Sequence, residues 1–295
     1  MRLKADLLLF LTSLIWGSAF SAQRVAAQFV GPFLFNGARF LLAGLALLLI
    51  FRRLPWKAER RQWLWMAAAG VFLFLASTLQ QAGLHWTTAA NAGFITTLYV
   101  VIVPLVLLAL GEKVTWQVWL GAALATGGAK LLSSPGTLHL APGDGLELLG
   151  AVIWAFHIVL ISRIVHHVDA MQFAIGQYLV CGALNLGVGL IADQQTIGGL
   201  FPAWWAIAYT GFFSVALGYT IQVIAQRFAP PGDAALIMGT EAIFAALFGY
   251  LTLGEGLTAI QIFGGGLILA AVVLVQWQRQ NAAVPVSEKT TKPGL

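Results

Sequence analysis

Ten polar or aromatic side chains lie inside segments that are otherwise apolar. At helical spacing Trp154 and His157 share one face, and Ser77 and Gln80 share another. Membrane-spanning helices keep such groups away from lipid and direct them into the bundle. Indole rings suit the side chain of an amphipathic zwitterion, and amides suit its charged groups. We therefore predict a binding site for such a molecule that is formed by Trp16, Ser77, Gln80, Asn91, Tyr99, Trp154, His157, Tyr219, Gln222 and Glu241.

The same side chains have a second interpretation, in which amides bond neighbouring helices and indoles fill core volume. Both interpretations stay open for any single residue. Glu241, an acid near the middle of its segment, either binds an ammonium group, carries a proton with His157 as relay, or bonds a neighbouring helix. Arg39 either anchors an anion or bonds backbone carbonyls and polar groups of the fold.

The composition places the elements that hold these residues in a membrane. Of 295 residues, 59% are hydrophobic and 9% are charged, and the mean hydropathy is +0.85. A soluble domain carries roughly 25% charged residues, so lipid must be the solvent for much of this chain. The formal charge of +5 comes from loop residues and does not indicate a nucleic-acid partner. Cys181 is the single cysteine, which excludes an intrachain disulfide and a thiolate metal site.

Apolar runs of about 20 residues, the length of a membrane-crossing helix, divide the chain into ten spans. The predicted fold is an all-α, polytopic membrane protein with a disordered tail over 281–295. The spans are expected near 5–25, 32–51, 63–83, 88–110, 115–132, 144–163, 170–191, 201–225, 233–252 and 257–277.

Lys and Arg residues predict the orientation of these spans. Thirteen of the sixteen lie in the termini and in alternate loops, whereas the opposite loops hold only Arg24 and Lys130. The side rich in Lys and Arg faces the cytoplasm. We therefore expect both termini to be cytoplasmic, in agreement with an even number of spans.

The two halves of the chain repeat one another. The run Leu110-Gly111-Glu112 recurs as Leu253-Gly254-Glu255, displaced by 143 positions, while Trp16 matches Trp154 at 138 and Gln80 matches Gln222 at 142. We expect a first five-helix repeat over 1–134 and a second over 135–280. Five is odd, so the second repeat enters the membrane from the other side. Inverted repeats of this kind are typical of transporters that open alternately to either face.

These motifs carry a family resemblance. Trp16-Gly17, Arg39-Phe40 and the two Leu-Gly-Glu-x-x-Thr segments resemble the drug/metabolite transporter superfamily, and more narrowly its ten-helix EamA-type exporters. The resemblance covers 5–277 and implies two EamA repeats and efflux of small metabolites. The aromatic content, with Trp16, Trp154 and His157, is most similar to the exporters of aromatic amino acids. Two positions depart from the family pattern: Ala242 follows Glu241 where proline is common, and Ala155 follows Trp154.

We therefore expect a secondary transporter in the bacterial inner membrane that exports amino acids or similar small metabolites. The alternatives are a drug or nucleotide-sugar transporter of the same fold, or a membrane pore. The sequence contains no Walker-type phosphate loop, no His-Glu-x-x-His run and no Gly-x-Ser-x-Gly elbow. We accordingly predict no enzymatic activity, no cofactor and no metal, with a small-molecule substrate and the lipid bilayer as partners.

Overall fold

The regular elements of the chain are helices. The structure is a computed structural model that describes residues 1–54, 56, 58–133 and 142–282, with side chains to residue 275. The first half contains α1 (Arg2–Ala26), α2 (Pro32–Ile50), α3 (Arg60–Gly83), α4 (Ala89–Thr97), α5 (Tyr99–Ala109) and α6 (Trp116–Ser133). The second half contains α7 (Asp144–Ile164), α8 (Ala170–Ala192), the short η1 (Gln194–Leu200), α9 (Trp204–Tyr209), the π-helix η2 (Thr210–Tyr219), α10 (Thr220–Ala225), α11 (Pro231–Met238), α12 (Glu241–Leu253) and α13 (Ala259–Ala282). Of the predicted tail over 281–295, residues 281 and 282 belong to α13, and residues 283–295 lie outside the described residues.

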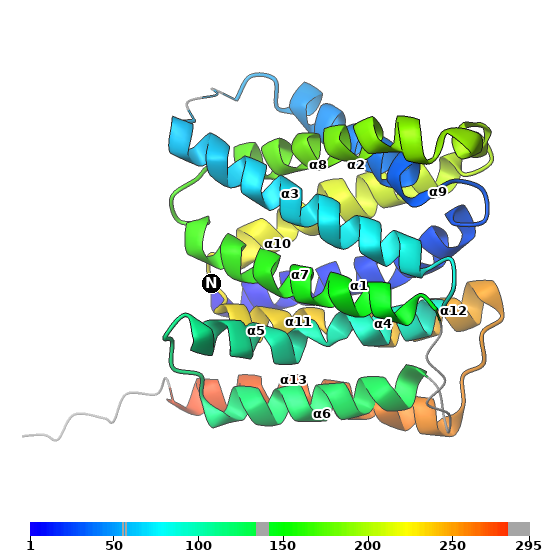
Figure 1. Ribbon diagram of the computed structural model, residues 1–295. Coiled ribbons are helices and arrows are strands. Elements are labelled where there is room, and N and C mark those ends of the chain that lie inside the picture. The colour runs from blue at the N-terminus through cyan, green and yellow to red at the C-terminus, as the bar shows by residue number, and fades with distance from the viewer. Residues whose placement is uncertain (55, 57, 134–141, 283–295) are drawn as a thin grey trace, which may run out of the picture.

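The helices confirm the predicted polytopic membrane fold. Eight helical stretches within the described residues are long and apolar enough to cross a bilayer, and each coincides with a predicted span. The other two predicted spans correspond to α6 and α13, which pack together along one side of the bundle (Figure 1). The start of α1 and the end of α13 lie at the same end of the bundle (Figure 1).

Three of the predicted spans are interrupted along their length. The span predicted over 88–110 breaks at Leu98, between α4 and α5. The span predicted over 233–252 breaks at Gly239 and Thr240, between α11 and α12. The span predicted over 201–225 passes through the π-helix η2. Discontinuous helices and π-turns within a membrane mark functional positions, since freed backbone groups need a polar cavity or a protein partner.

Matching helices of the two halves run antiparallel to each other. In the second pair, Gly37 of α2 meets Leu186 of α8, and Gly189 meets Leu34. In the fifth pair, α6 and α13 cross where the backbones of Gly128 and Gly264 touch, so close that a Cβ on either would clash with the other's carbonyl. Antiparallel mates are what an inverted repeat produces.

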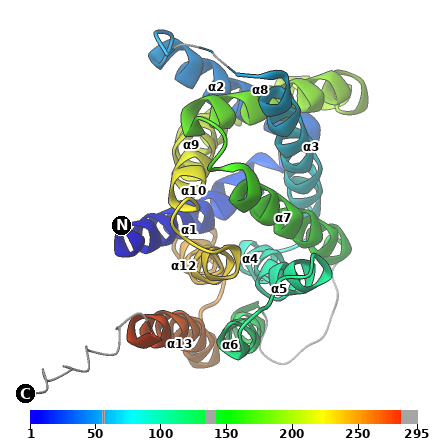
Figure 2. The ribbon, with the colours of Figure 1, turned by 90° about the vertical axis from the view of Figure 1, so that its left-hand side faces the viewer.

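An end-on view shows how these pairs enclose the centre. The α2–α8 pair lies on one side and the α6–α13 pair on the other, with α1, α3, α7, α10, α12 and the α4–α5 rod forming a ring between them (Figure 2). The site described next lies inside this ring.

The two ends of the bundle differ in charge, and we name them accordingly. The basic end holds Arg2, whose Nη1 donates to the carbonyl of Phe228 at 3.2 Å, and Arg163, which pairs with Glu112. The far end is opposite and holds the loops over 27–31 and 84–88. There the Glu255 carboxylate accepts hydrogen bonds from the backbone N–H groups of Ala89 and Ala90 at 2.9 and 3.2 Å.

Candidate functional site

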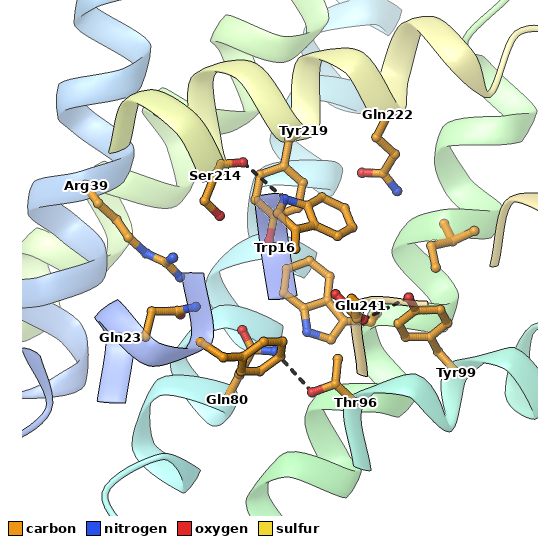
Figure 3. Close-up of a pocket in the computed structure, with 13 residues that line it drawn as sticks. Trp16, Gln23, Arg39, Gln80, Thr96, Tyr99, Ser214, Tyr219, Gln222 and Glu241 are labelled. Atoms are coloured by element: carbon orange, nitrogen blue, oxygen red, sulfur yellow. Dashed lines mark hydrogen bonds between the residues drawn. The ribbon is translucent and has the colours of Figure 1, made fainter. Parts of the chain in front are cut away.

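A cavity lies within the ring of helices and is lined by both halves of the chain (Figure 3). Its free volume is about 30 Å³, room for roughly two water molecules. A larger occupant therefore requires the lining side chains to move. The lining comprises Trp16, Phe20, Gln23, Arg39, Gln80, Thr96, Tyr99, Trp154, Ile158, Ser214, Tyr219, Gln222 and Glu241.

The internal repeat places matched residues around this cavity. Two pairs are separated by 138 positions and two by 142, the displacements of the helices that carry them. The same displacement of 142 separates the starts of α4 and α11, at Ala89 and Pro231. Eight of the lining residues thus form four matched pairs: Trp16 with Trp154, Phe20 with Ile158, Gln80 with Gln222, and Tyr99 with Glu241.

Three aromatic rings form one wall of the cavity. Tyr219, in the π-helix, lies with its ring centroid 4.6 Å from that of Trp16 and 5.7 Å from that of Trp154. The Trp16 indole Nε1 donates to the carbonyl of Ser214 at 3.1 Å. The Trp154 Nε1 is buried and has no hydrogen-bond partner among the described residues. An indole N–H without a partner beside a cavity is a donor available to an occupant.

An acid borders the cavity where two helices begin. Tyr99 starts α5 and Glu241 starts α12, directly after the two matched helix breaks. The Tyr99 hydroxyl donates to Glu241 Oε1 at 2.8 Å, and both residues are buried. The breaks therefore bring a carboxyl group, held in place by one hydrogen bond, to the cavity surface.

A guanidinium borders the cavity on the other side of the aromatic wall. Figure 3 shows Arg39 and the Glu241–Tyr99 pair on opposite sides of Trp16 and Tyr219. Arg39 is 1% exposed, and its Nε donates to Asn36 Oδ1 at 2.8 Å. Its Cζ lies 5.2 Å from the ring centroid of Phe35. Within the described part of the chain no carboxylate pairs with it, so a buried cation faces the cavity with polar and aromatic support alone.

Amide groups complete the lining. The Gln80 Nε2 donates to Thr96 Oγ1 at 3.1 Å. The side-chain carbonyl oxygens of Gln23 and Gln222 are buried and have no hydrogen-bond partner among the described residues. A molecule bound in the cavity can form hydrogen bonds with these two acceptors and with the Trp154 N–H.

Sequence comparison assigns the family of this chain. The model of the EamA-like transporter family matches residues 3–134 and again residues 141–277. The chain belongs to the EamA-like transporter family. The double match covers nearly the whole chain and confirms the resemblance drawn from the Leu-Gly-Glu and Trp-Gly segments.

Relatives of this EamA-family transporter carry transporter names without a stated substrate. An uncharacterized transporter of Archaeoglobus fulgidus is 32% identical over 283 residues, covering 93% of this chain and 86% of the relative. The uncharacterized inner membrane transporter YedA of Escherichia coli is 30% identical, covering 90% and 89%. A solved crystal structure superposes with a TM-score of 0.75 at 19% identity, covering 96% of this chain and 100% of the other; this likeness shows the fold. The family and the relatives are transporters, not enzymes.

Seven of the ten predicted site residues line the cavity of the EamA-family transporter. Three do not. Ser77 is buried between α3 and α8, where its hydroxyl lies 4.0 Å from the Cys181 sulfur. His157 is buried behind Trp154 and bonds the Gln177 side chain at 3.0 Å. Asn91 lies at the far end, 2.7 Å from Asp144.

Six lining residues are absent from the predicted site: Phe20, Gln23, Arg39, Thr96, Ile158 and Ser214. Phe20 and Ile158 carry the same 138-position displacement as the two tryptophans, so the repeat contained the signal. Thr96 lies one helical turn before Tyr99, and nothing in its own sequence context indicated a place in the site. Ser214 contributes through the π-helix, which apolar periodicity does not reveal.

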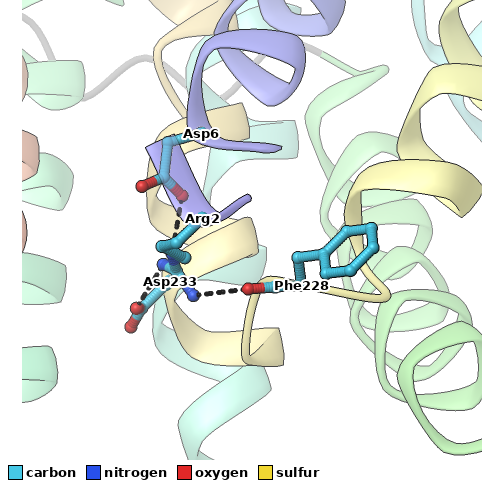
Figure 4. A network of polar contacts seen from close by, with 4 residues as sticks. All are labelled: Arg2, Asp6, Phe228 and Asp233. Carbon is cyan, nitrogen blue, oxygen red and sulfur yellow. Dashed lines mark hydrogen bonds and ion pairs between the residues drawn. The ribbon is translucent and has the colours of Figure 1, made fainter. Parts of the chain in front are cut away.

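Polar side-chain contacts at matched positions join pairs of helices at both ends of the transporter. At the far end the Asn91 Nδ2 donates to Asp144 Oδ1 at 2.7 Å, joining α4 to α7. At the basic end Arg2 joins α1 to α11 by contacting Asp6 Oδ1 at 2.9 Å and Asp233 Oδ2 at 2.6 Å (Figure 4). Asp6 matches Asp144 at 138 positions, and Asp233 matches Asn91 at 142. The repeat thus places equivalent contacts at opposite ends of the two halves.

Proposed function

We propose that this transporter exports amino acids, aromatic or hydrophobic ones included, or similar small metabolites by alternating access. The observation that carries the proposal is the separation of Arg39 and Glu241 on either side of the aromatic wall. A zwitterionic amino acid matches this arrangement: its carboxylate meets the guanidinium, its ammonium meets the carboxylate, and an apolar side chain packs on the rings. Glu241 and Arg39 then act as binding residues, with Gln80 and Gln222 as hydrogen-bonding partners.

The inverted architecture supports alternation between two open states. We take residues 1–134 and 135–280 as the two repeats, with the basic end in the cytoplasm and the protein in the bacterial inner membrane. Matched pairs place residues of both repeats around one cavity, as expected of a bundle in which the repeats move against each other. The 30 Å³ cavity is too small for such a substrate, so its lining side chains must move before one is bound.

Thermal unfolding of the purified transporter tests the substrate class. Ligand at about 100 times its Kd stabilises a protein by about 2.7 kcal/mol through mass action. We expect tryptophan, phenylalanine or leucine to stabilise the protein, and the matched analogues tryptophanamide and N-acetyltryptophan, each lacking one charge, to stabilise it less. A larger shift with tetraphenylphosphonium or a nucleotide sugar would favour the drug or nucleotide-sugar alternative.

Two variants assign the charges to their partners. Arg39→Gln should abolish the preference for tryptophan over its amide, because the carboxylate loses its partner. Glu241→Gln should abolish the preference for tryptophan over its N-acetyl form. Glu112→Gln, at an exposed ion pair of the basic end, is the matched control and should keep both preferences. Preferences that survive in both cavity variants would exclude this mode of binding.

A further inference from the structure

A buried acid lies next to the cavity without lining it. Glu147 is one turn inside α7 from the far end and is 0% exposed. Its Oε2 accepts a hydrogen bond from the Thr96 hydroxyl at 3.3 Å, while its Oε1 has no hydrogen-bond partner among the described residues. An ionised carboxylate with so few partners is costly within a membrane, and binding a proton removes that cost.

The fold makes room for this carboxyl group. Gly83, at the end of α3, lies so close that a Cβ there would come within 2.8 Å of Glu147 Cγ and 2.9 Å of its Oε1. The helices packed on Glu147 present Gly83 from α3 and Thr96 from α4. The titratable groups whose charge reaches it are Asp144 on its own helix and Glu241 on α12. No cation partners it among the described ion pairs.

Two hydrogen bonds link Glu147 to the cavity. Thr96 lines the cavity, donates to Glu147 and accepts from Gln80, which also lines the cavity. A threonine hydroxyl has one proton to donate and two lone pairs that accept. When Glu147 is ionised, Thr96 donates to it. When Glu147 holds a proton, that proton can be donated to Thr96, which frees the Thr96 hydroxyl proton for an acceptor in the cavity.

The repeat shows that this polar route exists in one direction only. The residue that matches Glu147 at 138 positions is Leu9, and the residue that matches Thr96 at 142 is Met238. Both are fully buried in the apolar core. Toward the far end, by contrast, Asp144 lies one turn from Glu147 and is 5% exposed.

We propose that Glu147 is a proton-binding site of this transporter, loaded from the far end and linked to the cavity through Thr96 and Gln80. Binding consists of the addition of one proton to a carboxylate oxygen and its later release, with no other bond changed. The coupling of that proton to substrate movement rests on the proposed function; proton binding itself does not.

Infrared spectroscopy of the substrate-free protein in lipid tests proton binding alone. A protonated carboxyl group has a C=O stretching band distinct from that of a carboxylate, and we expect such a band to change with pH in the wild type. The component of this band that belongs to Glu147 should be missing from the pH-difference spectrum of Glu147→Gln and retained in the spectra of Glu241→Gln and the control Glu112→Gln. A pH-difference spectrum of Glu147→Gln identical to that of the wild type would overturn the proposal.

Transport in proteoliposomes tests the coupling. We expect tryptophan transport driven by a pH gradient to be faster than tryptophan counterflow without a gradient. This stimulation should be lost in Glu147→Gln and kept in Glu112→Gln. Stimulation by a Na⁺ gradient in place of a pH gradient would count against the proposal. Absence of wild-type counterflow would contradict the proposed substrate while leaving the infrared result to decide on proton binding.

A second variant covers the case in which Glu147→Gln does not fold. Thr96→Val keeps the carboxyl group and breaks its link to Gln80. We expect the infrared band to remain and the stimulation by the pH gradient to be lost. Wild-type stimulation in Thr96→Val would refute the route through Thr96.

Discussion

The far end and the basic end of this transporter have the same geometry and different chemistry. At the far end α4 meets α7 through an amide and a carboxylate, Asn91 and Asp144, with the acid Glu147 one turn deeper. At the basic end α1 meets α11 through an ion pair between Arg2 and Asp233, with the apolar Leu9 one turn deeper. The repeat thus gives the two ends the same pair of contacting helices, whereas the side chains at the matched positions differ. The two ends therefore differ in polarity although their helices are arranged alike.

The largest effect should come from exchanging the residue types at the matched positions 9 and 147. Leu9→Glu places an acid among fully buried apolar residues and should destabilise the protein by about 3 kcal/mol. Glu147→Leu removes a buried acid that has no cation partner and accepts one hydrogen bond, from Thr96, and it should leave stability unchanged or raise it. Thermal unfolding in detergent measures both. Leu9→Met controls for packing and should cost less than about 1.5 kcal/mol. Equal destabilisation by Leu9→Glu and Glu147→Leu would show that the two matched positions do not differ in their tolerance of an acid.

A smaller effect is expected from loosening the basic end. Arg2 is one-third exposed but Asp233 is fully buried, so losing Arg2 leaves a buried carboxylate without this cation and costs more than the roughly 1 kcal/mol of an exposed pair. Arg2→Gln should therefore raise the population of separated α1 and α11 by at least about fivefold. Spin labels on cysteines at Leu3 and Phe228, in a Cys181→Ser background, report this separation by pulsed electron resonance. The control Lys4→Gln removes one positive charge from an exposed neighbour of Arg2. An identical distance distribution in both variants would show that Arg2 does not hold α1 against α11.

The smallest effects should separate the matched glutamates of the two ends. Glu255 accepts from two backbone N–H groups at the start of α4, a capping role worth about 1 kcal/mol. Glu112 forms an exposed ion pair with Arg163, with side chains 44% and 51% exposed, worth about 0.5 kcal/mol or less. Glu255→Ala should thus lower the unfolding temperature more than Glu112→Ala does. The reverse order would contradict this reading of the two ends.

The sequence predicted the fold because apolar length and basic loops are strong signals. Each of the eight membrane-length helical stretches coincides with a predicted span, and the matched residues Trp16 and Trp154 both line the cavity. The helix break before Tyr99 was missed because Leu98 is as apolar as its neighbours. The break before Glu241 was missed because a Gly239-Thr240 pair is also compatible with a continuous helix. Only the backbone shows that the hydrogen bonds change there.

Two predicted site residues that do not line this cavity, His157 and Ser77, show what helical spacing leaves open. Helical spacing shows that His157 and Ser77 avoid lipid, but a buried face can look toward a cavity or toward a neighbouring helix. His157 is satisfied by Gln177 and Ser77 packs on Cys181, contacts between residues 20 and 104 positions apart. Glu147 escaped notice because it lies near a span end, where acids are common. Its burial depends on Gly83 of another helix, which the sequence of α7 cannot indicate.

The near absence of free space in the cavity has a consequence for affinity. A substrate enters only during the fraction of time in which Trp16, Trp154 and Tyr219 stand apart. The measured dissociation constant therefore equals the intrinsic one divided by that fraction. Weak apparent affinity is then the signature of a carrier that works well. A ligand that stabilised the separated position of the rings too strongly would inhibit transport instead of being transported.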